Sequence, residues 1–255
     1  ELSEFYYRQI LIEDKLSDAI RNKEMYLYYQ PQVDVERNKI IGLESLLRWN
    51  NRELGNVSPG EFIPIAEQKG YIIEIGNWVL EESLKTFNSW QQKGFDLETI
   101  SINISSIELS RKNFRDNLVN LCKKYNVPHS KVKLEITERT LMINSEDNKK
   151  KIDGLIIDGF KIALDDFGTG YSNLKTMIDF FVHTLKIDKS LIDKIESKSS
   201  QVVIKAIIAL SNYFDSEIIA EGVETKEQLD ILIKLGCKRI QGYYFSKPLP
   251  EQEVE

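Results

Sequence analysis

Two adjacent aspartates end an apolar run in the stretch ALDDFGTGYS, residues 163–172. Two carboxylates this close repel each other, and each raises the pKa of the other unless a cation lies between them. The glycines that follow predict a loop with the backbone freedom to close over a neighbouring site. Taken alone, the pair Asp165–Asp166 fits a cation site and a polar loop after a strand equally well.

Further polar residues recur on one face of several predicted strands. Side chains alternate along a strand, so Glu135 in KVKLEIT (131–137) and Asn103 in TISINIS (99–105) lie opposite the apolar positions. Six strands are predicted to direct polar or charged side chains into the barrel interior, near the carboxyl ends of the strands. These side chains belong to Glu44, Asn103, Glu135, Asp165, Lys186, Asp188 and Glu221. Buried unpaired charges are costly, which disfavours a purely structural role.

Carboxylate and amide oxygens are the ligands that hard divalent cations prefer. Two cations about 4 Å apart that share a carboxylate would explain the pair Asp165–Asp166 and suit phosphoester hydrolysis. Lys186 is placed to neutralise charge in the transition state of that reaction. His129 and His183 have no partners at ligand spacing, so we expect Mg²⁺ or Mn²⁺ rather than zinc.

Composition limits the class of protein. The chain has 255 residues, of which 42% are hydrophobic and 29% charged, as in a soluble globular protein. A formal charge of −6 disfavours binding to a nucleic-acid polymer. No secretory signal or membrane-spanning apolar run is visible. Cys122 and Cys237 fit two buried thiols in a reducing compartment, so we expect a cytoplasmic domain, alone or as the cytoplasmic part of a membrane-attached protein.

Strand-like runs alternate with helical patterns along most of the chain. Helices are predicted at residues 74–94, 200–214 and 225–236, the last capped by Thr225 and ended by Gly236. The strands are predicted at residues 25–33, 40–49, 99–105, 131–137, 160–165, 182–188, 217–222 and 238–244. Eight strands in this order indicate an α/β fold, a (β/α)8 TIM-like barrel. The link between the first two is too short for a parallel crossover, so one of them should run antiparallel.

An ordered set of segments resembles the EAL-domain phosphodiesterases, which cleave cyclic di-GMP. No single segment is decisive, but the set runs in family order and covers about residues 15 to 250. The segments are YYQP (28–31), ESLLRW (44–49), NISSIELS (103–110), LEITE (134–138), DDFGTGYSNL (165–174), LKIDKSLI (185–192), AEGVET (220–225) and QGYYFSKP (241–248).

The resemblance implies a role for each matching residue. The first metal would be held by Glu44, Asn103, Glu135 and Asp165, and the second, or its waters, by Asp165, Asp166 and Asp188. The catalytic residues would be Lys186, beside the attacking water, Glu221, which orients a metal or water, and Asp166. Substrate contacts are expected from Gln30, Arg48 and Gln241, of which Arg48 suits a phosphate fork. Glu138, three residues after Glu135 and on the other side of a strand, resembles the anchor of the DFGTGYS loop. Glu224 either supports the site or is an exposed acid at a helix start.

The resemblance also implies two ions per site, Mg²⁺ or Mn²⁺, with cyclic di-GMP as ligand and a homodimer as the assembly. The domain itself is expected at residues 15–255. Residues 1–14 are predicted to be a linker or the end of an upstream segment, and a regulatory domain would be typical upstream.

Two positions depart from the family pattern, and they leave the function open to alternatives. Ser45 stands where alanine is usual; it should point away from the metals, with its hydroxyl bonded to a backbone carbonyl. Asn173 stands where serine is common in the loop. The leading hypothesis is hydrolysis of cyclic di-GMP to linear pGpG. The alternatives are a catalytically silent sensor of the same fold and an unrelated metal-dependent barrel hydrolase.

Overall fold

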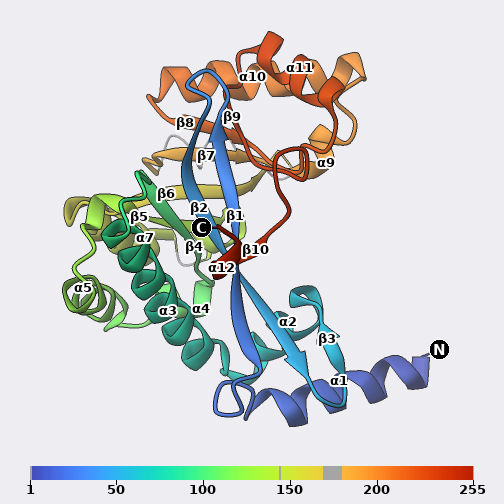
Figure 1. The fold of residues 1–255 in the computed structure, drawn as a ribbon, viewed down its shortest axis with the longest axis vertical. Coiled ribbons are helices and arrows are strands. Elements are labelled where there is room, and N and C mark those ends of the chain that lie inside the picture. The colour runs from blue at the N-terminus through green and yellow to red at the C-terminus, as the bar shows by residue number, and fades with distance from the viewer. Residues whose placement is uncertain (1, 144, 169–179, 255) are drawn as a thin grey trace.

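Eight strands close into a barrel in the computed structural model, which describes residues 2–143, 145–168 and 180–254 (Figure 1). The ring runs β1–β2–β4–β5–β6–β7–β8–β9 and returns to β1. The strands of the ring are β1 (Met25–Asp34), β2 (Lys39–Asn51), β4 (Thr99–Asn103), β5 (Val132–Thr137), β6 (Lys161–Phe167), β7 (Thr184–Ile187), β8 (Glu217–Ala220) and β9 (Arg239–Ile240). The predicted TIM-like barrel is confirmed.

The antiparallel strand is β1. It pairs antiparallel with β2 on one side and with β9 on the other, whereas every other neighbouring pair in the ring is parallel. Two short strands, β3 (Gly55–Val57) and β10 (Leu249–Pro250), extend the sheet outside the ring. The β1–β2 ribbon reaches beyond the barrel toward α1 and α2 (Figure 1).

Helices cover the outside of the barrel. Three of them, α3 (Ile72–Gln92), α10 (Lys198–Tyr213) and α11 (Lys226–Leu235), match the predicted helices. Thr225 caps α11 by accepting a hydrogen bond from the Gln228 N–H, and Gly236 ends it in the left-handed conformation. The other helices are α1 (Leu2–Leu16), α2 (Pro59–Lys69), α4 (Ser106–Ser110), α5 (Phe114–Lys124), a 3₁₀ turn (His129–Lys131), α6 (Glu138–Met142), α7 (Ser145–Ile157), α9 (Lys189–Ile192) and α12 (Glu251–Val254). No described helix has both the length and the apolar composition to cross a membrane.

The main apolar core lies between the barrel and its helices, while the barrel interior is polar. On β4, Ile100 and Ile102 belong to the apolar core, whereas Ser101, on the other face, is fully buried. Gln32, Lys133 and Lys186 are buried polar residues of the ring strands as well. TIM barrels ordinarily fill this interior with branched apolar side chains. The polar interior of this barrel therefore departs from the usual pattern.

The two histidines and the two cysteines make ordinary structural contacts. His129 stacks on Phe160, and its Nδ1 lies 2.8 Å from a backbone carbonyl oxygen. The Ile162 N–H donates to Nδ1 of His183. Cys122 and Cys237 are buried free thiols.

Candidate active site

Lys186 lies at the centre of a cluster of four carboxylates. Its ammonium Nζ is 2.7 Å from Glu221 Oε1, 3.3 Å from Asp165 Oδ1 and 3.4 Å from Glu44 Oε2, and it forms a still closer ion pair with Glu135. These residues come from β2, β5, β6, β7 and the residue after β8. Neighbouring parallel strands bring their carboxyl ends to one rim, so side chains distant in the sequence meet there.

Amide side chains surround Glu44 at the same rim. Asn103 Nδ2 donates to Glu44 Oε1 at 2.8 Å, and Gln241 Nε2 donates to Glu44 Oε2. Gln241 Nε2 also donates to Gln30 Oε1 at 3.1 Å, and Gln30 donates in turn to the Ser246 carbonyl oxygen. The structure therefore brings Gln30, Asn103 and Gln241 into the carboxylate cluster.

A β-bulge separates Asp165 from Asp166. Leu164 pairs with Leu185 but Phe167 pairs with Ile187, so β6 carries one extra residue between these points. Asp166 has a φ of 55°, in the left-handed region that side chains rarely adopt. A bulge redirects side chains at the end of a strand. Here Asp165 turns into the cluster, while Asp166 is exposed at the rim.

Asp188 lies next to this bulge rather than in the Lys186 cluster. Its Oδ1 accepts a hydrogen bond of 2.9 Å from the Ser190 N–H, which caps α9. Partial burial raises the pKa of Asp166, and the neighbouring charges of Asp165 and Asp188 raise it further. Asp165, Asp166 and Asp188 are therefore close enough at the bulge for their charges to interact.

The charges of the cluster do not balance. Burial raises the pKa of Glu135 well above its ordinary value, and the charge of Glu44 raises it further. Burial also raises the pKa of Glu221, to about 8, despite the nearby ammonium of Lys186. Burial acts to lower the pKa of Lys186, but the surrounding carboxylates outweigh it and raise that pKa. One ammonium cannot neutralise four carboxylates.

Glu44 is the exception among these acids. Burial raises its pKa, but the charge of Lys186 and the donors on Gln241 and Asn103 outweigh that effect, so the pKa of Glu44 is lowered. Of Glu44, Glu135 and Glu221, Glu44 is therefore the acid that most favours its ionised form.

The donor set fits hard divalent cations, although Lys186 now lies among the carboxylates. Glu135 Oε1 and Asp165 Oδ1 are buried oxygens that accept no hydrogen bond from the described residues. Such oxygens, with excess negative charge, are what Mg²⁺ or Mn²⁺ would use. Within the described chain, no three His, Cys, Asp or Glu side chains are arranged as a ready metal site. A cation would have to displace the ammonium from part of its contacts.

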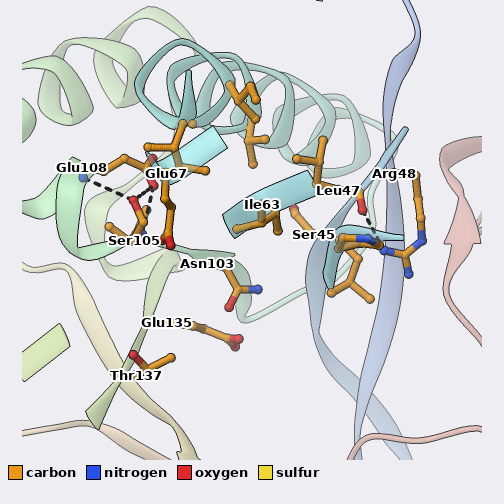
Figure 2. Close-up of a pocket in the computed structure, with 17 residues that line it drawn as sticks. Ser45, Leu47, Arg48, Ile63, Glu67, Asn103, Ser105, Glu108, Glu135 and Thr137 are labelled. Carbon is orange, nitrogen blue, oxygen red and sulfur yellow. Dashed lines mark hydrogen bonds between the residues drawn. The ribbon is translucent and has the colours of Figure 1, made fainter. Parts of the chain in front are cut away.

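Two cavities flank the cluster. The first has a volume of about 330 Å³ and is lined by Asn103 and Glu135 at one end and by α2 and α3 residues at the other (Figure 2). The second, of about 310 Å³, is lined by Glu44, Asp165 and Lys186 together with residues that follow β8 and β9. The carboxylates therefore lie between two spaces of similar size.

Arg48 and Glu224, two further predicted site residues, also lie outside the cluster. Arg48 Nη1 donates to the Leu47 carbonyl oxygen at 2.8 Å, and its guanidinium lies 5.8 Å from the centre of the Tyr28 ring. Arg48 lines the first cavity and Glu224 lines the second, where Glu224 accepts a hydrogen bond of 2.6 Å from Lys189.

Glu138 corrects one detail of the prediction. We expected it on the far side of a strand, but the strand ends at Thr137 and Glu138 is the buried first residue of α6. The DFGTGYS loop that it was predicted to anchor begins at Asp166, but its part from residue 169 on, and Asn173, fall outside the described residues.

Ser45 corrects a second expectation. It points away from the cluster into the first cavity, as predicted, and is only 3% exposed (Figure 2). Its hydroxyl oxygen, however, has no hydrogen-bond partner among the described residues, although we expected it to bond a backbone carbonyl. The departure from alanine at this position therefore leaves a buried hydroxyl unsatisfied.

Three buried polar residues were missed by the sequence analysis. Gln32 and Lys133 lie two residues from Gln30 and Glu135 and share their faces, so strand alternation could have indicated both. Glu108 lines the first cavity and is 4% exposed. Its burial depends on close contact with Gly76 of α3, which no local pattern shows.

Comparison with known proteins decides the family. The sequence model of the EAL domain matches residues 13–248. This chain belongs to the EAL domain family. Over 242 residues it is 40% identical to the signaling protein YkoW of Bacillus subtilis (strain 168), which covers 94% of this chain and 30% of YkoW. Over 254 residues it is 34% identical to the cyclic di-GMP phosphodiesterase PA2567 of Pseudomonas aeruginosa, covering 98% of this chain and 43% of that one.

Solved structures agree. The PaMucR phosphodiesterase in its c-di-GMP complex has a TM-score of 0.91 and 33% identity, and the match covers 96% of this chain and 100% of that one. PA2567 and PaMucR are thus both named as phosphodiesterases, which supports a hydrolase. This chain spans only 30% and 43% of the length of YkoW and PA2567.

Proposed function

We propose that this domain is a metal-dependent phosphodiesterase that hydrolyses cyclic di-GMP to linear pGpG. One observation carries the proposal: a carboxylate cluster at the carboxyl ends of the barrel strands lies between two cavities of about 330 and 310 Å³. Cyclic di-GMP has two guanosines related by a twofold axis, joined through two phosphodiesters. Such a ligand could place one guanosine on each side of the scissile phosphate.

The residues of the cluster divide into two proposed ligand sets. Glu44, Asn103, Glu135 and Asp165 would hold one Mg²⁺ or Mn²⁺, and Asp165, Asp166 and Asp188 the other or its waters. Glu135 Oε1 and Asp165 Oδ1 support this assignment, because neither accepts a hydrogen bond from the described residues, although Asp165 Oδ1 forms an ion pair with Lys186. When bound, the two cations would supply Lewis acidity at the phosphoryl oxygen and make a water molecule more acidic.

Lys186 and Glu221 would act on the reacting atoms. The attacking water forms a new P–O bond as the P–O3′ bond breaks. The water gives up a proton, and the departing O3′ takes up a proton from solvent. Glu221 lies 2.7 Å from Lys186 and opens to the second cavity, where it could orient that water and accept its proton. The ammonium of Lys186 would stabilise charge that develops on the phosphoryl oxygens.

Substrate contacts are proposed from both cavities. Gln30 and Gln241 line the second, and Arg48 lines the first, where its planar guanidinium can form a fork with a phosphate. Glu224 would support the second cavity through its ion pair with Lys189. Glu138, at the start of α6, is proposed to anchor the loop that follows Gly168.

The larger context is also a proposal. The domain would occupy residues 15–255, after a linker or the end of an upstream segment. It would be cytoplasmic, alone or as part of a membrane-attached protein, with a regulatory domain upstream, and would form homodimers. The length of the relatives is consistent with additional domains.

Incubation with cyclic di-GMP, with and without Mg²⁺, tests the function. We expect cyclic di-GMP to be converted to pGpG only when the cation is present. Chromatography of the reaction mixture measures the conversion. Tight binding of cyclic di-GMP without cleavage, in Mg²⁺ and in Mn²⁺, would identify a silent sensor instead. Absence of both binding and cleavage would reject the proposed substrate.

A further inference from the structure

Gln32 lies inside the barrel, farther from the rim than the carboxylate cluster: it pairs with Gly42 of β2, whereas Gln30 pairs with Glu44. It is on β1, two residues after Gln30, and is fully buried. Its amide nitrogen Nε2 lies 3.0 Å from Gln241 Oε1 and 3.5 Å from Ser101 Oγ. Gln32 touches none of the four carboxylates that pair with Lys186 through a described hydrogen bond, so any effect on the cluster must pass through Gln241.

The carboxylate of Glu44 fixes the orientation of the Gln241 amide. An ionised carboxylate only accepts hydrogen bonds, so Gln241 must turn Nε2 toward Glu44. Its Oε1 then points down the barrel and needs a donor, which Gln32 Nε2 provides. With the Gln241 amide reversed, its oxygen would face the carboxylate oxygen and the hydrogen bond would be replaced by repulsion. The chain Gln32–Gln241–Glu44 therefore has one direction.

Position 32 contributes only the donor half of its amide. Gln32 Oε1 is buried and has no hydrogen-bond partner among the described residues. The side chain is also confined: a Cβ added at Gly42, on the neighbouring strand β2, would lie 3.2 Å from Gln32 Oε1 and 2.7 Å from Thr99 Oγ1. Retaining an amide with a buried unsatisfied oxygen is costly. The contact with Gln241 is the interaction that offsets this cost.

We propose that Gln32 is a positioning residue, which orients Gln241 and through it holds Glu44 in the geometry that binds cation. The inference rests on the proposed function for its effect on turnover. It also predicts an effect on cation affinity that does not depend on the substrate. A side chain at position 32 that donates a hydrogen bond to Gln241 should be sufficient for this role, because Gln32 Oε1 has no hydrogen-bond partner among the described residues.

The first experiment compares Gln32→Met, which fills similar space without a donor, with Gln32→Lys, which keeps a donor. At saturating Mn²⁺ we expect kcat to fall about tenfold in Gln32→Met, with KM for cyclic di-GMP changed less. Gln32→Lys should stay within about threefold of the parent. Ser101→Ala is the matched control, since it alters the other neighbour of the same nitrogen and should behave as the parent. Parental kcat in Gln32→Met, or equal losses in a folded Gln32→Lys, would overturn the inference.

A double-mutant cycle with Gln241→Met separates positioning from packing. If Gln32 acts through Gln241, Gln32→Met should weaken Mn²⁺ binding about three- to tenfold in the parent and add almost nothing to Gln241→Met. Calorimetric titration of Mn²⁺ without substrate measures this, and melting curves confirm that each variant is folded. Additive losses would contradict the inference. A parent that does not cleave cyclic di-GMP would reject the proposed function, while the Mn²⁺ titrations would still decide the role of Gln32.

Discussion

The Lys186 cluster holds four carboxylates around one buried ammonium, whereas Glu108 is buried in the wall of the first cavity beside Ser105 and Gly76. Glu108 accepts hydrogen bonds from the N–H and hydroxyl of Ser105, at 2.9 and 2.6 Å, as part of the capping box of α4. A Cβ on Gly76 would lie 1.7 Å from its Oε1, so α3 closes over it. Both regions bury acidic side chains, but only the cluster contains a positively charged side chain, Lys186.

The difference separates two ways of burying a carboxyl group. In the cluster, Lys186 keeps Glu44 ionised, and its pKa is lowered. At the other site, burial raises the pKa of Glu108 to about 7, and the charge of Glu67 adds to the effect. An acid held for cation binding must stay ionised, whereas a helix cap accepts hydrogen bonds in either state. The contrast predicts that loss of a charge abolishes turnover in the cluster, whereas at Glu108 it changes only the stability.

The largest effect is expected from Asp165→Asn. An amide lacks the charge that two cations would share, so turnover of cyclic di-GMP should fall below about a thousandth of the parent rate. The fold should survive and even gain stability without metal, because removing a charge from the cluster relieves repulsion. Initial rates in saturating Mg²⁺ and melting curves in EDTA measure the two effects.

Asp158→Asn is the matched control for this variant. It makes the same change just before β6 begins, where Asp158 pairs with Arg115 on the outside of the barrel. Turnover should remain parental there. Near-normal hydrolysis by Asp165→Asn would show that the two-cation assignment is wrong.

Lys186→Met should cost stability where Asp165→Asn does not. Removing the ammonium leaves two buried carboxylates, Glu44 and Glu135, and two partly buried ones without their counter-ion. Such a change typically destabilises by about 3–5 kcal/mol. Urea unfolding in EDTA should show this loss, and saturating Mg²⁺ should restore part of it. Lys189→Met, which breaks a half-exposed ion pair with Glu224, should change the free energy of unfolding by less than about 1 kcal/mol. If both variants lost the same small amount of unfolding free energy, Lys186 would not be stabilising the cluster through its charge.

Glu108→Gln should instead stabilise the protein, and only at higher pH. The pKa is about 7 in the fold against 4.5 for the ordinary group, so the folded state binds the proton more tightly. Stability therefore falls as pH rises from about 4.5 to 7 and stays reduced above it, by about 3 kcal/mol. Glutamine keeps the hydrogen bonds to Ser105 without the charge. Its gain in unfolding free energy should be large at pH 8 and nearly absent at pH 4.5.

Urea unfolding at the two pH values provides the measurement. Glu227→Gln, an exposed substitution at the start of α11, should show no such dependence on pH. A gain for Glu108→Gln that is the same at pH 4.5 and pH 8 would mean that the carboxyl is not titrating in this range.

Strand alternation predicted the centre of this site because it fixes which side chains face the barrel interior. Glu44, Glu135 and Lys186 follow from it, and closure of the parallel strands then brings them together. Thr225 and Gly236 were predictable for a similar reason, since helix caps act within a few residues. Sequence patterns therefore predict a feature when it depends on residues close in the sequence, as a helix cap does, or on an alternation that every strand of the barrel follows.

The features that were missed depend on pairing between distant segments. The bulge at Asp165 and Asp166 exists only in the register of β6 against β7. Arg48 turns to the ring of Tyr28, which the β1–β2 ribbon places beside it. Glu108 is buried because α3 brings Gly76 against its carboxyl group. No spacing within the sequence contains this information.

The smallest effect concerns Ser45, which lies beside the cluster but faces the cavity wall that also contains Glu108. Its hydroxyl is buried without a partner, so Ser45→Ala removes an unsatisfied group and should stabilise the fold by about 1 kcal/mol. The side chain points away from the carboxylates, and turnover should stay within about threefold of the parent. Ser83→Ala is a suitable comparison, because that buried hydroxyl on α3 also lacks a partner among the described residues. Melting temperatures and rates with cyclic di-GMP and Mg²⁺ should show both alanine variants slightly more stable and both active. A parent that binds without cleaving, and that gains activity in Ser45→Ala alone, would instead show that serine at this position disables the site.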